Sequence, residues 1–416
     1  MRARIAFLSL LAGCISISSN LSAIEFSDIY AAIGDAADTR LSNTGLAIFP
    51  TLVIPSGGEF EGMATAYTAV ARDVSFLDAN AAASSTLEFT ELTFTHNNWI
   101  ADTYIDGAIY TMRFDDLGLA FGGKFLHVPF KRYGLTEQIA SGRYSEGTVG
   151  ANISYNFLRT FYYPGLSVGA TVKSAYRYVP EIIAPGQSAV GFAADVGLLT
   201  RFNFLKTFPS RSPNFAAGVA AKNFGPPVEG EPLPSQVTTG IAYSPIRPVT
   251  LAMDFIVPVS LAAGVPSEQI SGAVGTTVQI APFFSVQTGV LLRWGGTRIT
   301  LGATLRLTDV TIVSNYTLDL ATQFSNFNRL SVQAQLNFGD RGRGALRDHV
   351  DQLYLDAWLL SAGGDLEEAV DLLQKALALD DTFIPAAELL VLTQRSLDLQ
   401  EELRDIDLEA LGDTGQ

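Results

Sequence analysis

The chain has 416 residues, room for one large domain and a smaller one, and only 17% of them are charged, against about 25% in ordinary soluble domains. Beyond the N-terminus, no apolar run approaches the roughly 20 residues that a membrane-spanning helix needs. Residues 347–416 hold 17 acids and 4 bases, so they carry −13 of the net charge of −15, and the absence of any basic stripe argues against a nucleic-acid partner.

Residues 1–23 have the pattern of a signal peptide. A basic start is followed by an apolar core, and the residues before Ile24 suit cleavage after Ala23. Residues 11–14 resemble a lipobox, which would instead place a lipid on Cys14. Both interpretations predict export, and the short apolar stretch before Cys14 favours cleavage after Ala23. Cys14 is the only cysteine, so neither a disulfide framework nor a thiolate metal site is expected.

Residues 24–84 are rich in Ala and Gly and lack the strict alternation of strands. Their second half resembles the N-terminal hatch of the outer-membrane long-chain fatty acid transporter (FadL) superfamily. There a glycine-led helix of small residues, an Ala-x-Asp segment and an Asn-Pro-Ala-Gly turn precede the first strand. The residues that match are Gly62, Ala71, Asp73, Asn80 and Ala82. Ala81 and Ala83 replace the proline and the second glycine of that turn.

The resemblance covers residues 24–338. Residues 96–102 (HNNWIAD) are similar to the PorV-like branch and to an uncharacterised spirochaete-type group of the same superfamily. The resemblance implies an outer-membrane barrel in residues 85–338, plugged by a hatch in residues 24–84. It implies passive uptake of a long-chain fatty acid or another hydrophobic ligand. The PorV-like similarity implies an alternative: a non-transporting barrel that acts as a docking scaffold or a secretion and assembly component.

Alternation with a period of two predicts the strands independently. In residues 299–307 (ITLGATLRL), apolar residues alternate with small or polar ones, which gives the strand one apolar face. Such strands fit a soluble sandwich with that face inward or a membrane barrel with that face toward lipid. The low charge favours the barrel. In this phase Leu301 faces lipid and Thr300 faces the lumen, where we expect an introduced charge to be tolerated far better.

Fourteen antiparallel strands are predicted, an even number as in bacterial outer-membrane barrels. They lie near residues 87–97, 102–112, 117–128, 146–157, 165–174, 188–204, 213–224, 235–244, 248–257, 267–280, 284–293, 297–308, 309–319 and 328–338. An even count brings both barrel ends to the side of the short turns, and the longer connections at residues 129–145 and 207–214 are expected on the other side. Residues 157–163 are expected in an interfacial girdle. Phe338 resembles the terminal aromatic that the barrel assembly machinery recognises.

Three bases fall in the inward phase of an otherwise weakly charged barrel: Lys173, Arg293 and Arg306. They are candidates to hold the carboxylate of a fatty acid by charge-assisted hydrogen bonds. The alternative is that these bases are lumen charges, paired with one another or with hatch acids such as Asp73 and Asp78.

After a linker at residues 339–346, expected to be flexible, the sequence period becomes helical. Residues 347–416 form an acidic tail, in which one segment resembles a tetratricopeptide repeat followed by a further helix. The residues at the consensus spacing are Ala357, Leu360, Gly364, Ala369, Leu373 and Ala376. Because an anionic lipid surface repels this charge, we expect the tail to project into the periplasm. There it binds a protein partner or, alternatively, braces the barrel mouth.

The sequence offers little for catalysis. No pair among His96, His127 and His349 has metal-ligand spacing, and no nucleophile elbow, phosphate loop or dinucleotide fingerprint is present. We therefore predict no enzyme activity, no cofactor and no metal site. The leading function is uptake of fatty acids or similar molecules through the outer membrane. The docking scaffold is the second prediction, and a soluble exported sandwich is the third.

Overall fold

A computed structural model describes residues 47–99, 103–133, 138–182, 185–208, 212–262, 265, 267–293, 297–320 and 328–413. The predicted signal peptide, the lipobox at Cys14 and the first part of the predicted hatch lie outside the described residues. Among the helices that the structure describes, none combines the length and the apolar character that crossing a bilayer requires.

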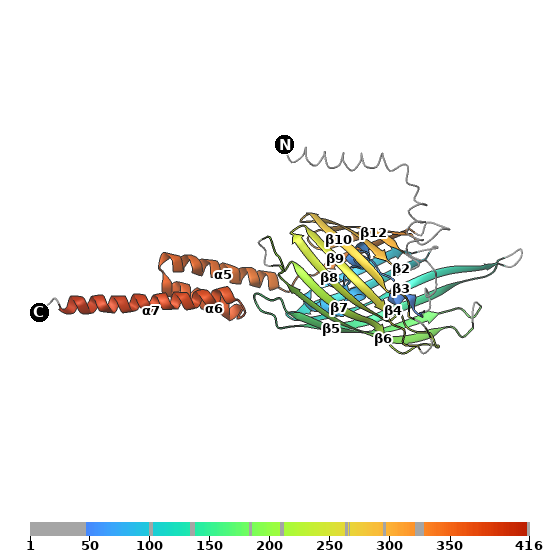
Figure 1. Cartoon of the computed structure of the whole chain (residues 1–416), viewed down its shortest axis with the longest axis horizontal. Coiled ribbons are helices and arrows are strands. Elements are labelled where there is room, and N and C mark those ends of the chain that lie inside the picture. Colours follow the sequence, from blue (N-terminus) through green and yellow to red (C-terminus); the bar gives the residue numbers. More distant parts are fainter. Residues whose placement is uncertain are drawn as a thin grey trace, which may run out of the picture.

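The prediction of a fourteen-stranded antiparallel barrel is confirmed (Figure 1). The strands are β1 (Glu91–Asn98), β2 (Tyr104–Phe114), β3 (Leu117–Tyr133), β4 (Gln138–Phe157), β5 (Leu166–Tyr178), β6 (Ala189–Phe202), β7 (Phe215–Phe224), β8 (Gln236–Ile246), β9 (Val249–Pro258), β10 (Ser271–Ala281), β11 (Phe284–Leu292), β12 (Arg298–Arg306), β13 (Val310–Asp319) and β14 (Arg329–Asn337). Each strand pairs with its sequence neighbours, and β1 pairs with β14 to close the barrel. Closure leaves no edge strand with unpaired backbone groups.

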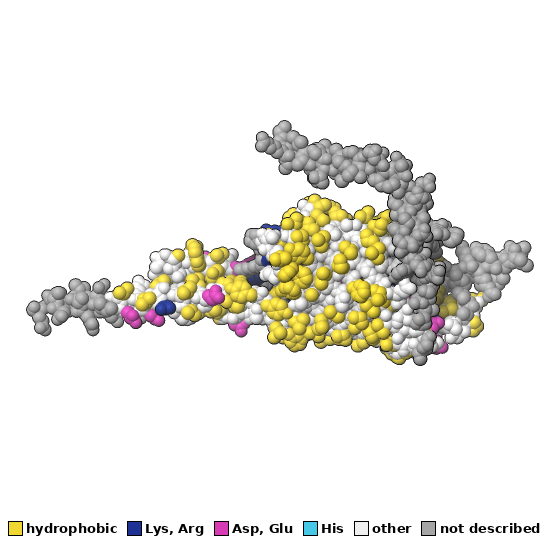
Figure 2. Space-filling view, viewed as in Figure 1, with side chains coloured by type: hydrophobic (Ala, Val, Ile, Leu, Met, Phe, Trp, Pro, Cys, Tyr) yellow, Lys and Arg dark blue, Asp and Glu magenta, His cyan; other side chains and the backbone are white. Residues whose placement is uncertain are grey.

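The outward surface of the barrel is apolar. The side chain of Leu301 is 52% exposed on this surface, whereas Thr300 is only 2% exposed and faces inward, so the predicted phase is confirmed. Hydrophobic side chains cover much of the side of the barrel that Figure 2 shows. Aromatic residues lie at both ends of the strands, for example Tyr104 and Phe114 on β2, about 25 Å apart along the barrel axis at ordinary tilt. A bilayer-spanning barrel presents this kind of surface.

The inside of the barrel is filled by the segment that precedes β1, residues 47–90, here called the inner segment. It contains the short helices η1 (Pro50–Leu52), α3 (Gly58–Gly62), α4 (Phe76–Ala79) and η2 (Ala81–Thr86). Most of its side chains are buried, and they form the hydrophobic core together with inward residues of the strands. Thr300 donates a hydrogen bond to the carbonyl of Gly62 (2.9 Å). Thr300 thus faces inward, and the inner segment occupies the space beside it.

Of the two long connections, residues 129–145 lie on the predicted side of the barrel but form strands, and residues 207–214 lie on the other side. Residues 129–145 are mostly strand, because β3 and β4 continue as a hairpin past the end of the barrel opposite the tail (Figure 1). Residues 207–214 join β6 to β7, and the strand order places this connection at the same end as the tail. Thr207 there donates to the carbonyl of Pro245, in the β8–β9 region of that end. A long connection is thus no guide to the side of the barrel.

The tail consists of three helices that project from one end of the barrel (Figure 1). They are α5 (Arg343–Gly363), α6 (Leu366–Leu379) and α7 (Ile384–Asp413). Four of the six residues at the predicted repeat spacing, Ala357, Ala369, Leu373 and Ala376, are fully buried between helices, as close helix packing needs. Leu360 is half-buried, and Gly364 ends α5 in a left-handed conformation (φ 95°). The tetratricopeptide character itself stays a prediction.

The linker is an ordered junction, in contrast to the flexible exit that we expected. Helix α5 already begins at Arg343, whose guanidinium donates to the carbonyls of Arg113 (3.0 Å) and Glu88 (2.5 Å) at the barrel rim. The carboxylate of Asp340 accepts hydrogen bonds from the backbone N–H of Gly344 and of Gly342. These bonds hold the pKa of Asp340 below its ordinary value. Phe161, expected in the girdle, instead packs edge-on against Phe383 of the tail (5.2 Å between centroids).

The assignment of the lipid-facing side chains can be tested by introducing the same charge at two depths in the bilayer. Leu301 lies near the middle of β12, and Leu307, which is 55% exposed, lies in the turn after it. We expect Leu301→Arg to lower the free energy of unfolding by about 2–4 kcal/mol and Leu307→Arg by about 0–1 kcal/mol, because the cost of a charge falls from the bilayer centre to its interface. Urea unfolding in lipid vesicles measures both. Equal losses would contradict the assignment of a lipid-facing band.

Candidate functional site

The inner segment lies directly against the barrel wall at positions where the wall has glycines. A Cβ atom added at Gly289 would lie 2.5 Å from the carbonyl carbon of Met63, and one at Gly218 would lie 2.5 Å from the carbonyl oxygen of Thr68. Further inward glycines meet the inner segment in the same way: Gly118, Gly169, Gly197 and Gly275. Any side chain at these positions would displace the inner segment from the wall.

The structure places all five predicted hatch residues inside the barrel. Asn80 holds the inner segment to the wall, since its amide donates to the carbonyls of Thr68 and Leu198 (both 2.9 Å) while its oxygen accepts from the backbone of Ala82 (3.1 Å). The carboxylate of Asp73 accepts from the hydroxyl of Tyr67 (2.8 Å). Gly62 lies too close to β13 to carry a side chain, and Ala71 is fully buried. That these residues act as a gate stays a prediction.

The three predicted ligand-binding bases do not converge. Lys173 pairs with Asp195 on the neighbouring strand (2.6 Å), and Arg293 pairs with Glu268. Arg306 pairs with Glu59 of the inner segment (2.8 Å). Each base therefore has its own acid, which is the arrangement that the alternative interpretation describes.

The acids of the inner segment are held in the same way. Glu59 also pairs with Arg72 (2.6 Å). Asp78 pairs with Lys124 of β3 (2.8 Å), a base that we did not single out from the sequence. These pairs are internal to the protein, so they join the inner segment to the wall and do not leave a cation for a ligand.

A cavity of about 310 Å³ lies between the inner segment and the wall, at the end of the barrel opposite the tail. The apolar residues that line it include Val53, Ile54, Phe60, Leu233, Ile256 and Leu291. Of the three predicted bases, only Arg293 lines it, together with its partner Glu268 and with Arg298. A cavity of this size is at the lower end of the range of small-molecule sites.

Lys222 on β7 is the lumen base that the sequence analysis missed. It is 6% exposed and lines the cavity, and its ammonium donates to the backbone carbonyl of Asp78 (3.0 Å) and lies 5.7 Å from the ring centre of Phe60. Among the described residues, no carboxylate forms an ion pair with it. Two acids lie near it: Asp195 pairs with Lys173, and one carboxylate oxygen of Asp254 accepts from the backbone N–H groups of residues 67 and 68.

The sequence pattern that identifies Lys222 as an inward base is present. In residues 215–224 (FAAGVAAKNF) the inward phase contains Ala216, Gly218, Ala220 and Lys222, the same alternation that identified Lys173. The difference between the two bases depends on the register of neighbouring strands, which brings Asp195 of β6 beside Lys173 of β5.

The fold and the filled lumen define a class: closed barrels of fourteen antiparallel strands with an internal plug. Within that class, residues 27–340 match the model of an uncharacterised protein family, UPF0164, and the chain belongs to this family. A UPF0164 protein of Treponema pallidum (strain Nichols) is 26% identical over 400 residues, which is 91% of each chain. A second UPF0164 protein of the same organism is 30% identical over 177 residues, 41% of this chain and 51% of the relative.

Among solved structures, the CymD monoaromatic hydrocarbon channel is similar in fold, with a TM-score of 0.50 and 11% sequence identity over 69% of this chain and 98% of the channel. The Ralstonia pickettii toluene transporter TbuX aligns over 68% of this chain and 99% of its own, at 12% identity and a TM-score of 0.48. At 11% identity, the similarity to CymD shows the fold alone.

The close contact between glycine and inner segment can be tested by adding one methyl group. Gly289→Ala brings a Cβ against the backbone of Met63, whereas Gly272→Ala on the adjacent strand meets nothing closer than 3.8 Å. We expect Gly289→Ala to lower the free energy of unfolding by about 1–3 kcal/mol and to expose the inner segment to protease. Gly272→Ala should change neither quantity. If the two variants behave alike, the inner segment does not rest on the wall as described.

Proposed function

We propose that this protein is an outer-membrane channel for the passive uptake of long hydrophobic molecules, in particular fatty acids. One observation carries the proposal: a cavity inside the barrel, lined in part by apolar side chains, contains the buried ammonium of Lys222, which has no ion-pair partner among the described residues. A long-chain carboxylate matches both features, because its chain suits the apolar lining and its head group can accept a charge-assisted hydrogen bond from Lys222. The family relationship and the fold are compatible with this function.

The direction of uptake follows from where the cavity lies. The cavity is at the end of the barrel opposite the tail, and the inner segment fills the barrel between the cavity and the tail end. With the tail in the periplasm, the cavity receives ligand from the outside. Release then requires the inner segment to shift or to open locally.

A docking scaffold is the second candidate. Two features favour it: the inner segment is fixed to the wall by glycine contacts and ion pairs, and the tail exposes large apolar side chains such as Trp358 (51%). In a scaffold, the cavity would be a packing defect that never opens. In both candidate functions the tail would be a protein-binding surface, since we propose that it binds a periplasmic protein.

Replacing the cavity base separates these functions. We expect Lys222→Gln to weaken oleate binding by about tenfold, because the carboxylate loses its charged donor, and to leave the binding of an uncharged alkane within about twofold. Lys222→Arg should restore much of the oleate affinity. Titration of the detergent-purified protein with labelled oleate measures each variant.

The matched control is Lys206→Gln, which removes the same charge at the tail end of the barrel, away from the cavity. It should bind oleate as the wild type does. Saturable oleate binding that Lys222→Gln leaves intact would contradict the role of this residue. No saturable lipid binding by the wild type would favour the scaffold.

Deletion of the tail tests whether the barrel folds and binds ligand without it. Because β1 pairs with β14 before the tail begins, we expect deletion of residues 348–416 to leave a barrel that still migrates differently on a gel before and after boiling, and that still binds oleate. Cross-linked periplasmic partners should disappear. Loss of the folded barrel would show instead that the tail braces the mouth, in line with the contact between Phe161 and Phe383.

A further inference from the structure

The last helix of the tail has an apolar face that no part of the described chain covers. Leu392, Leu399 and Leu403 are 63%, 52% and 63% exposed. Their spacings of seven and four residues place them on one face of α7, in line with the half-buried Leu389. This is the pattern of one strand of a helical pair, and exposed apolar surface of this kind marks an interaction site.

The length of α7 explains why this face is open. Helix α7 has 30 residues and α6 has 14, so α7 continues for about 24 Å after α6 has ended. The side of α7 that packs against the other helices is a different one, on which Ala386 and Thr393 are fully buried. Leu399 and Leu403 lie on this extension and lack a partner helix within the part of the tail that the structure describes. Leu389, at the start of the leucine face, packs against the core of the tail, and Leu392 beside it is exposed.

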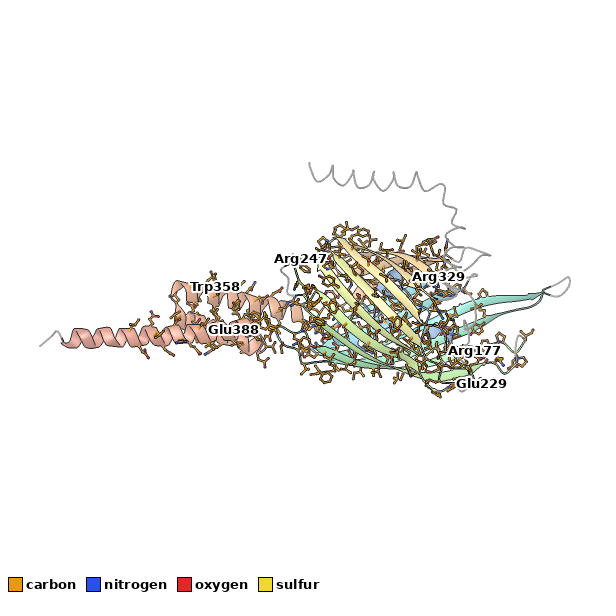
Figure 3. All side chains as sticks on the ribbon, in the orientation of Figure 1. Arg177, Glu229, Arg247, Arg329, Trp358 and Glu388 are labelled. Atoms are coloured by element: carbon orange, nitrogen blue, oxygen red, sulfur yellow. The ribbon has the colours of Figure 1, made fainter. Side chains whose placement is uncertain are left out.

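The charged residues beside the leucine face indicate the charge of its partner. Glu388, Asp398 and Glu402 are exposed on α7, with Arg395 as a base among them (Figure 3 labels Glu388). The whole tail carries −13 from 17 acids and 4 bases. In a membrane, all copies of the protein point their tails to the same side, so a second copy would bring like charges together. An anionic lipid surface is disfavoured for the same reason.

We propose that the leucine face of α7 binds a basic amphipathic helix of another periplasmic protein, one that has leucines at heptad spacing and Lys or Arg beside them. The inference rests on the proposed role of the tail as a binding module, and it is independent of lipid uptake. The apolar seams of the two helices would interdigitate, and the flanking bases of the partner would pair with the acids of α7. The ordered junction at Asp340 and Arg343 fixes the direction in which α7 presents this face.

A pair of synthetic peptides tests the proposal on the full-length protein in phosphatidylcholine nanodiscs. Both peptides are three-heptad helices with leucine at the seam, and they differ only in carrying lysine or glutamate at the flanking positions. We expect the lysine peptide to bind saturably and at least about tenfold more tightly than the glutamate peptide, as followed by fluorescence anisotropy. Raising the salt concentration should narrow that difference.

Variants separate the leucine face from the bilayer and from the rest of the tail. Leu399→Asp combined with Leu403→Asp should weaken lysine-peptide binding by about tenfold or more. Leu379→Asp, the same change at a 42% exposed leucine at the end of α6, should stay within about twofold of the wild type. The gel mobility of the unboiled barrel and oleate binding should be unchanged in all variants.

Three outcomes would overturn the proposal: the two peptides bind equally, the double variant binds as the wild type does, or neither peptide binds. If sedimentation velocity shows a dimer that the double variant abolishes, the face is covered by a second copy and the proposal also fails. Because oleate binding is read in the same samples, each of these failures is distinguishable from a failure of the channel function.

Discussion

The contact between the inner segment and a wall without side chains is the constraint on which the rest of this structure depends. A barrel of fourteen strands has more internal space than its own inward side chains fill, and here the inner segment fills it. Glycines on several strands allow the backbone of the inner segment to approach, as at Gly289 and Met63. Because a shift of one residue turns every side chain to the other face, these glycines also fix the register of the strands that carry them.

Ion pairs also fix the inner segment to the barrel wall. Burying a lone charge is costly, and the lumen pairs its charges across the inner segment and the wall, as in Asp78 with Lys124 and Glu59 with Arg306. These pairs hold the segment in place and are unavailable to a ligand. Lys222 differs, because a carbonyl oxygen and an aromatic ring stabilise its ammonium without neutralising it. Under the proposed function, a carboxylate bound in the cavity would accept a hydrogen bond from this ammonium.

Much of the fold could be predicted from the sequence, because apolar residues alternate with small or polar ones along each strand and so identify the face that meets lipid. The number of strands, their approximate bounds and the orientation of Leu301 follow from it. The site could not be predicted to the same degree, since alternation says which residues face inward and not which of them meet. Lys173 and Lys222 have the same pattern, and only the register of the neighbouring strand gives Lys173 an acid partner. Thr300 faces inward as expected, but the inner segment occupies the space beside it.

The ordered junction between the barrel and the tail restricts the direction in which the acidic tail extends. With a flexible linker, a segment of −13 would drift away from its own membrane and meet partners at random angles. Here Arg343 is hydrogen-bonded to two carbonyls of the barrel rim, Asp340 caps the start of α5, and Phe383 packs on Phe161. The tail is thus held at more than one point, and its helices extend from the rim in a set direction. A partner that binds the far part of α7 is therefore held on the tail side of the barrel and away from its rim (Figure 1).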